Sequence, residues 1–258
     1  MSGNIASTAK STTAATAREV VVVGATSAVA QSAIRLWAAR GATLALVGRN
    51  QDALDRVAAD ARMRGAASVS THAGDLADLV FIESLCATTT PAVALVAHGS
   101  LTDSAHAETS AEYLDYELTL NFVSAAQWMQ RLALAIERAG GGGTVVAISS
   151  VAGDRGRGSN HAYGAAKAGL TAFCSGLRAR MATRGVHVVT VKPGFIDSPM
   201  TAHITKKGAL WATPEAIAEG VLKAIDRQRD VVYLPGFWAW IMLIIKHVPE
   251  RIFKRLKF

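Results

Sequence analysis

Short runs of β-branched and other apolar residues alternate with longer segments of helical pattern along most of this chain. The run 20–23 is valine at every position, as expected for a strand that is buried on both faces. Strands that alternate with helices favour a parallel sheet with helices packed on both sides. We therefore expect an α/β fold built on a doubly wound parallel sheet of about seven strands.

The ends of these runs give the expected elements. Strands are expected at 20–23, 43–47, 68–72, 93–97, 144–149, 186–192 and 231–234. Helices are expected near 27–39, 52–64, 76–88, 111–138, 162–184 and 214–227. Four successive glycines at 140–143 end the fourth of these helices before the next strand begins. The sequence indicates neither an internal repeat nor a second domain.

The chain has 258 residues, enough to bury one large core. Residues 1–17 are rich in Ser, Thr and Ala and lack the apolar core of a signal peptide, so we expect a disordered leader. Cys86 and Cys174 lie far apart without the spacing of metal ligands, which favours a reducing, cytoplasmic compartment and no metal site. The net charge of +7 is not gathered into a basic, aromatic-rich face, so we expect no nucleic-acid partner.

A hydroxyl, a phenol and an amine stand where they could exchange one proton with a substrate. Tyr163 and Lys167 are four residues apart and would project from one face of a helix. Ser150 follows an apolar run that would carry its hydroxyl to the edge of the sheet. A lysine cation beside Tyr163 would lower the pKa of the phenol. This set predicts acid–base chemistry, although a lone Tyr-x-x-x-Lys is more often a buried tyrosine beside a solvated lysine.

A turn of small residues follows the first expected strand and opens a helix, with the sequence Gly24-Ala25-Thr26-Ser27-Ala28-Val29-Ala30. The backbone N–H groups of such a turn can approach a pyrophosphate at the positive end of the helix. Alanine stands at positions 28 and 30, where glycine is usual, and a position that needs a positive φ would resist alanine. The turn favours a dinucleotide weakly, and the alternative is an ordinary strand-to-helix connection.

The second expected strand is not followed by the carboxylate that an NAD site normally uses. Arg49 follows it instead, and a guanidinium suits a ribose 2′-phosphate. We therefore expect NADP(H) rather than NAD(H); the alternative is an arginine exposed in a turn. After the third strand, Asp75 and Leu76 are expected near the adenine. After the fourth, Ala97-His98-Gly99 is expected near the nicotinamide ribose, with His98 in a structural role.

Taken together, these residues make the chain resemble the short-chain dehydrogenase/reductases of the classical type, from about Arg18 to about Arg229. The resemblance is carried by residues 148–153, by Tyr163-x-x-x-Lys167 with Tyr163 thirteen residues after Ser150, and by residues 192–200. It implies a Rossmann-type domain over residues 18–236. It also implies an NAD(P)H-dependent oxidoreductase that reduces ketones or oxidises alcohols, assembled as a homodimer or homotetramer.

The resemblance further implies a role for each site residue. Tyr163 would be the acid in reduction and the base in oxidation, and Ser150 would orient the substrate carbonyl. Lys167 would lower the pKa of the phenol and hold the nicotinamide ribose. Asn121 would hold a helix carbonyl and a water that feed a proton relay. The loop that would hold the carboxamide and the diphosphate contains Pro193, Gly194, Ile196 and Ser198.

Residues 237–258 form an apolar and basic C-terminal extension of the same domain. Residues 237–245 are too few to span a bilayer but enough for insertion in its plane, with tryptophans near the headgroups. Beyond Pro249, a helix would align apolar side chains against a cationic face. Two alternatives remain open: peripheral contact with the inner face of the cell membrane, and packing on the active site or in an oligomer interface.

The extension and the altered glycine turn are also similar to a subgroup that includes the decaprenylphosphoryl-2-keto-ribose reductase of mycobacteria. The leading hypothesis is an NADP(H)-dependent ketoreductase whose substrate is a lipid-linked keto-sugar or another amphiphilic ketone. The alternatives are a soluble 3-oxoacyl or small-ketone reductase, and a non-catalytic dinucleotide-binding regulatory protein. The intact set of Asn121, Ser150, Tyr163 and Lys167 argues against the regulatory protein. Residues 152–160 and 201–211 are expected to line the substrate entrance.

Overall fold

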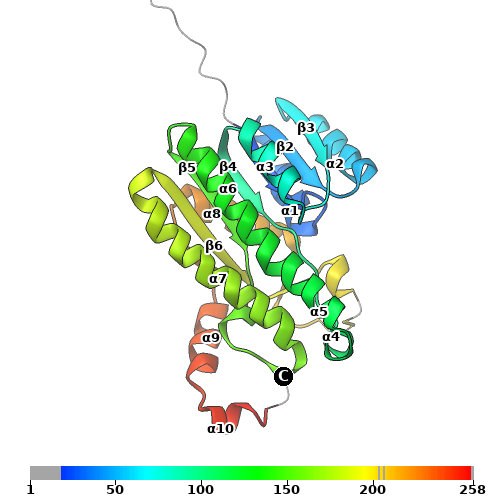
Figure 1. The fold of residues 1–258 in the computed structure, drawn as a ribbon, viewed down its shortest axis with the longest axis vertical. Coiled ribbons are helices and arrows are strands. Elements are labelled where there is room, and N and C mark those ends of the chain that lie inside the picture. Colours follow the sequence, from blue (N-terminus) through cyan, green and yellow to red (C-terminus); the bar gives the residue numbers. More distant parts are fainter. Residues whose placement is uncertain (1–18, 203, 206, 257–258) are drawn as a thin grey trace, which may run out of the picture.

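A computed structural model describes residues 19–202, 204–205 and 207–256, and its ribbon is drawn in Figure 1. Its main sheet has seven strands in the order β3-β2-β1-β4-β5-β6-β9, and every neighbouring pair is parallel. The doubly wound parallel sheet expected from the sequence is confirmed. The leader expected at 1–17 lies outside the described residues.

The strands lie where the apolar runs predicted them, with small differences at their ends. They are β1 (Glu19–Val23), β2 (Thr43–Gly48), β3 (Ser68–Ala73), β4 (Pro91–Val96), β5 (Gly143–Ile148), β6 (Val186–Pro193) and β9 (Val231–Leu234). The strand order reverses between β1 and β4, and a sheet of this kind binds ligands beyond its carboxyl ends at such a reversal.

Helices cover both faces of the sheet (Figure 1). Those before the C-terminal extension are α1 (Ala28–Ala39), α2 (Gln51–Met63), α3 (Leu79–Thr88), α4 (Ser104–Thr109), α5 (Ala111–Leu118), α6 (Ser124–Arg138), α7 (His161–Met181) and α8 (Pro214–Asp226). The side chains of β1 alternate between two cores. Val20 and Val22 pack with α1, α2 and α8, whereas Val21 and Val23 pack with α3, α6 and α7.

The single helix expected over 111–138 is interrupted in the structure. A π-helical turn, η1 (Thr119–Val123), separates α5 from α6 and contains Asn121. The side-chain amide of Asn121 donates to the Glu117 carbonyl at 3.1 Å, an acceptor one turn earlier. A side chain that takes up a helix carbonyl favours a wider turn at that point, and π turns are frequent at functional sites. The helix expected from 76 begins instead at Leu79, because Asp78 caps it.

The C-terminal extension forms α9 (Trp238–His247) and α10 (Glu250–Phe253) beyond the edge strand β9 (Figure 1). Trp238 and Met242 of α9 are buried against Val151, the residue after Ser150. Nearby, β7 (Phe195–Ile196) and β8 (Trp211–Ala212) pair as a small second sheet. Within the described ranges, no helix is both long enough and apolar enough to cross a bilayer.

Candidate active site

The carboxyl ends of the central strands open into one cavity of about 780 Å³. It lies at the reversal of strand order, where parallel α/β sheets bind their ligands. The expected cofactor residues that line it are Gly24, Thr26, Ser27, Ala28, Val29, Arg49, Leu76, Ala97, His98, Gly99, Pro193, Gly194, Ile196 and Ser198. The expected catalytic residues that line it are Asn121, Ser150, Tyr163 and Lys167.

Asp75 is the expected cofactor residue that is not among the lining residues. Its Oδ1 accepts the backbone N–H of Ala77 at 3.0 Å, so the carboxylate closes a local turn. The neighbouring Leu76 is buried, and its carbonyl accepts the indole N–H of Trp128 at 2.9 Å. The structure thus holds Leu76 at the cavity and turns the Asp75 carboxylate toward its own backbone.

The turn after β1 is tight and leads into a capped helix despite its alanines. Gly24 has a φ of +78°, and a Cβ there would lie 2.6 Å from the backbone nitrogen of His98, so this position requires glycine. Ser27 caps α1 by accepting the N–H of Ala30 at 3.3 Å. Ala28 and Ala30 belong to α1 and neither has a positive φ, so alanine is not strained there. Ser27, Ala28 and Val29 line the cavity, so the positive end of α1 faces it.

His98 has the environment of a structural residue. It is buried, and its Nε2 is 2.8 Å from the hydroxyl oxygen of Ser124. Burial, together with the smaller effects of the Lys167 and Arg49 charges, lowers its pKa to about 3, so the imidazole is neutral near pH 7. This agrees with the structural role expected from the sequence. The adjacent Gly99 has a φ of +149°, and a Cβ there would lie 2.7 Å from Oδ1 of Asn121.

Asn121 is fully buried at the centre of a polar cluster that sequence reasoning missed. Its Oδ1 accepts the backbone N–H of Ser100 at 3.1 Å, and its amide donates to the carboxylate of Glu117 at 3.1 Å. That carboxylate is also buried and accepts the hydroxyls of Ser100 at 2.7 Å and Thr102 at 2.8 Å. The one signal in the sequence is that Glu117 precedes Asn121 by four residues, which places both on one helix face.

Tyr163 and Lys167 project from α7 toward the end of β5, and Ser150 lies two residues beyond that end. The Nζ of Lys167 lies 5.7 Å from the ring centroid of Tyr163 and donates to the carbonyl of Ile148 at 3.3 Å. The hydroxyl of Ser149 donates to the carbonyl of Lys167 at 3.0 Å, which ties β5 to α7. A hydroxyl, a phenol and an amine thus meet in one cavity.

The sequence led us to expect that Lys167 lowers the pKa of the Tyr163 phenol. The pKa shifts of the two side chains in the structure differ from this expectation. Burial raises the pKa of the Tyr163 phenol, and a hydrogen bond with Ser150 lowers it by less. Burial also lowers the pKa of Lys167 to about 8. Both shifts have one physical cause, because exclusion of water disfavours the phenolate and the ammonium alike. Spacing along a helix predicts that the two groups are close, but not how little water reaches them.

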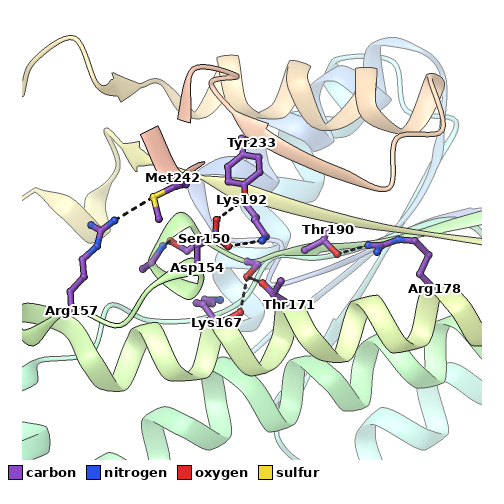
Figure 2. A network of polar contacts seen from close by, with 12 residues as sticks. Ser150, Asp154, Arg157, Lys167, Thr171, Arg178, Thr190, Lys192, Tyr233 and Met242 are labelled. Atoms are coloured by element: carbon purple, nitrogen blue, oxygen red, sulfur yellow. Dashed lines mark hydrogen bonds and ion pairs between the residues drawn. The ribbon is translucent and has the colours of Figure 1, made fainter. Parts of the chain in front are cut away.

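A second network, also absent from the sequence analysis, holds the segment that follows Ser150 (Figure 2). Asp154 ends the 3₁₀ turn η2 (Val151–Asp154), and its Oδ1 lies 2.6 Å from Nζ of Lys192 on β6. Its Oδ2 accepts a hydrogen bond from the phenol of Tyr233 on β9 at 2.6 Å. Burial raises the pKa of that phenol, and so do the hydrogen bond to Asp154 and the charge of Asp154. Two strands therefore anchor the turn next to Ser150.

The C-terminal extension packs on this same region with one of its two faces. Trp238 is only 2% exposed, and its indole lies where a Cβ on Gly194, in the loop expected to hold the cofactor, would be. Arg155 donates to the Glu250 carboxylate at 2.6 Å and lies 4.3 Å from the ring centroid of Phe253. Of the two alternatives left open for the extension, packing near the active site therefore describes the face that carries Trp238 and Phe253. The opposite face of α9 is open, with Trp240 72% exposed.

Comparisons with known proteins agree with this geometry. A family model described as short chain dehydrogenase matches residues 18–209. The chain is 36% identical over 245 residues to an uncharacterized oxidoreductase of Mycobacterium tuberculosis, covering 93% of this chain and 97% of that protein. A short-chain dehydrogenase from Sphingobium yanoikuyae, solved in complex with NADPH, matches with a TM-score of 0.75 at 22% identity, over 90% of this chain and 97% of that one. An actinorhodin polyketide ketoreductase with NADPH has a TM-score of 0.74 at 21% identity, over 85% and 97%.

Proposed function

The chain belongs to the short-chain dehydrogenase family of oxidoreductases, and from this premise we propose that it is an NADP(H)-dependent ketoreductase. The observation that carries the proposal is the meeting of Ser150, Tyr163 and Lys167 in the cavity that the N-terminus of α1 also faces. A phenol beside a hydroxyl and an amine can donate one proton to a carbonyl oxygen. The start of a helix in the same cavity suits the diphosphate of a dinucleotide.

The residues present fit a nicotinamide dinucleotide. Gly24 allows the tight turn against His98 that leads into α1, and Ser27 opens this helix, whose N–H groups would bind a diphosphate. Arg49 is exposed at the cavity, where its Nη1 lies 3.3 Å from the phenol oxygen of Tyr116, and it would bind a ribose 2′-phosphate. The two solved relatives described above contain NADPH, which supports this cofactor. Bound NADPH supplies the hydride of the reduction.

In this proposal the chain supplies the proton and orients the ketone. Ser150 donates a hydrogen bond to the carbonyl oxygen, and Tyr163 transfers its phenolic proton to that oxygen as the alcohol forms. A new proton from solvent water then restores the Tyr163 phenol, along the side of the cavity where Lys167 and Asn121 both approach Gly99. The Glu117 cluster holds the Asn121 amide in place.

The first prediction concerns the 2′-phosphate. In the wild type, NADPH is expected to bind about ten- to a hundredfold more tightly than NADH, because a charge-assisted contact contributes on the order of 1.5–3 kcal/mol. Arg49→Ala should remove this preference by weakening NADPH alone. Fluorescence titration of both cofactors measures the effect, and Arg56→Ala, on an exposed position of α2 outside the cavity, is the matched control. Equal affinities in the wild type would exclude NADP(H) specificity.

We further propose that the substrate is amphiphilic and that the open face of the extension contacts an anionic membrane surface. Trp240 and Ile244 are 72% and 70% exposed, and Leu243 beside them is exposed as well. Apolar side chains of this size favour burial among lipid headgroups and acyl chains. The exposed cations that flank them are Lys246, Arg251, Lys254 and Arg255. Each cation near an anionic leaflet contributes about 1 kcal/mol.

The double variant Trp240→Ser, Ile244→Ser tests this membrane contact. It should lower binding to vesicles of phosphatidylcholine and phosphatidylglycerol by at least about a hundredfold, because each lost burial costs about 1.5–3 kcal/mol and the two together cost about 3–6 kcal/mol. Co-sedimentation at low and at physiological salt measures both the apolar and the screened cationic contribution. Met63→Ser, Val80→Ser, at exposed positions elsewhere, is the control. If the wild type stays in the supernatant and the double variant dissociates an oligomer instead, this face is a subunit interface.

A further inference from the structure

We propose that Tyr116 is a second ligand of the cofactor's 2′-phosphate, so that Arg49 and Tyr116 together select NADP(H) over NAD(H). The inference deepens the proposed function and rests on it for the cofactor. Tyr116 lies on α5, whereas Arg49 directly follows β2. The Nη1 of Arg49 donates a hydrogen bond to the phenol oxygen of Tyr116 at 3.3 Å. The two residues are 67 positions apart, and no pattern in the sequence links them.

The contact between Arg49 and Tyr116 crosses the end of the cavity at which α1 begins. In the sheet, β2 lies on one side of β1, and β4, which precedes α5, lies on the other. Two strand spacings of ~4.8 Å therefore separate the ends of β2 and β4 by about 10 Å. Besides burial and the charge of Lys167, the charge of Arg49 lowers the pKa of His98, which follows β4. The guanidinium thus extends from the β2 side of the cavity toward the β4 side.

The direction of this hydrogen bond determines what the pair can bind. A guanidinium has five N–H donors, and a phenol can accept one hydrogen bond while it donates another. Because the oxygen of Tyr116 accepts from Arg49, its own O–H points to a different acceptor. Among the residues that the structure describes, neither side chain has a second hydrogen-bond partner. A phosphate monoester has three strong acceptor oxygens, so it can accept from the guanidinium and from the phenol together.

The carboxylates closest to this pair along the chain leave the charge of Arg49 unpaired. Asp52 and Asp115 are exposed, and within the described ranges Arg49 forms no ion pair. Glu117, the residue after Tyr116, is buried in the polar cluster described above. The positive charge at this end of the cavity therefore favours an anionic ligand.

A 2′-phosphate at this end has few other donors. Residues 24–30, the turn that opens α1, contain neither Lys nor Arg, so Arg49 supplies the charge. Asn50, the next residue, uses its side-chain oxygen to cap α2 by accepting the N–H of Ala53 at 2.8 Å. A phenol bound to Arg49 adds a donor and also restricts the rotamers of a long, exposed side chain. Such preorganisation increases affinity without a second charge.

Fluorescence titration of NADPH and NADH against the wild type and Tyr116→Phe tests this proposal. The substitution keeps the ring and removes only the O–H. NADPH affinity should fall about tenfold, the lower end for a hydrogen bond to a charged group, because Tyr116 is 49% exposed. NADH affinity should not change, since NADH has no 2′-phosphate. Calorimetry with adenosine 2′,5′-bisphosphate and adenosine 5′-monophosphate repeats the comparison on the adenosine half alone.

A double-mutant cycle tests whether Arg49 holds the phenol in place. Once Arg49→Ala has removed the guanidinium, Tyr116→Phe should weaken NADPH binding much less than it does in the wild type. Fully additive losses would overturn the proposed pairing, because they would show that the two side chains act independently.

Tyr113→Phe is the matched control, because it makes the same change on the same helix. The phenol oxygen of Tyr113 accepts the backbone N–H of Asp103 at 3.1 Å, so this residue should affect neither cofactor. Equal losses of NADPH affinity in Tyr113→Phe and Tyr116→Phe would assign the effect to the packing of α5 and overturn the proposal. An equal loss for NADPH and NADH in Tyr116→Phe would also overturn it, by assigning the phenol to the part that both cofactors share.

Failure of this proposal differs from failure of NADP(H) specificity itself. A wild type that binds NADPH and NADH equally would exclude the specificity, and Tyr116 as its determinant along with it. A clear wild-type preference for NADPH that Tyr116→Phe leaves unchanged would reject Tyr116 alone and place the second donor elsewhere, for example on the amide of Asn50.

Discussion

Tyr163→Phe is expected to lower the rate of ketone reduction by about 10²–10⁴-fold, the contribution of one positioned acid, while cofactor affinity stays close to that of the wild type. The substitution removes a single oxygen, and the ring still packs on α7 beside Lys167. Turnover of 2-decanone, followed by NADPH absorbance, measures the rate, and fluorescence titration measures NADPH binding. A loss in kcat with little change in the dissociation constant of NADPH identifies a group that acts in the transition state.

Tyr113→Phe is the matched control for this substitution. The phenol oxygen of Tyr113 accepts the backbone N–H of Asp103 at 3.1 Å, and the residue does not line the cavity. Its removal should leave the rate within a few-fold of the wild type. Near-normal reduction by Tyr163→Phe would refute the proposed proton donor, because no other phenol among the described lining residues could replace it.

Asp154→Ala is expected to destabilise the protein by about 3–5 kcal/mol, because it leaves the charge of Lys192 buried without its partner. The Lys192 side chain is 9% exposed and that of Asp154 is 3% exposed, so water cannot replace the lost carboxylate without rearrangement. A domain is typically stable by about 5–15 kcal/mol, so this loss is large. Denaturation by urea, with the midpoint and slope fitted together, gives the free energy of unfolding.

A triple variant separates the buried charge from the volume of the side chains. Asp154→Leu, Lys192→Met and Tyr233→Phe together remove the ion pair and the phenol that depends on it. Most of the stability should return, because no buried charge is left unpaired. If Asp154→Ala alone were as stable as the wild type, the network of Asp154, Lys192 and Tyr233 would not be what holds the η2 turn.

The substitutions at Asp154, Lys192 and Tyr233 should also lower activity, because they release the turn that begins at Ser150. Asp154 ends the turn that Ser150 begins, and Lys192 precedes the loop that contains Gly194. Loss of this anchor should therefore lower kcat in the triple variant even where stability returns. Asp154 and Lys192 are positioning residues in this account, so the expected effect is smaller than that of Tyr163→Phe.

Much of the fold was predictable because it depends on neighbours in the sequence. Valine runs form strands that are buried on both faces, and their alternation with helices specifies a parallel sheet. The spacing of Tyr163 and Lys167 places both on one helix face whatever the rest of the chain does. Ser150 was predictable for the same reason, since it directly follows the apolar run 144–149. The periodicity of apolar residues and the ends of the strands are enough to predict these features.

Tertiary structure alone decided the features that join distant segments. Asp154 is 38 residues from Lys192 and 79 from Tyr233, and no local pattern links them. The π turn at Asn121 and the docking of Trp238 on the loop that contains Gly194 likewise depend on packing. The pKa of Tyr163 follows burial, which overrides the nearby lysine. Periodicity specifies which face of an element is apolar, but the water excluded from a site is determined only when separate elements pack together.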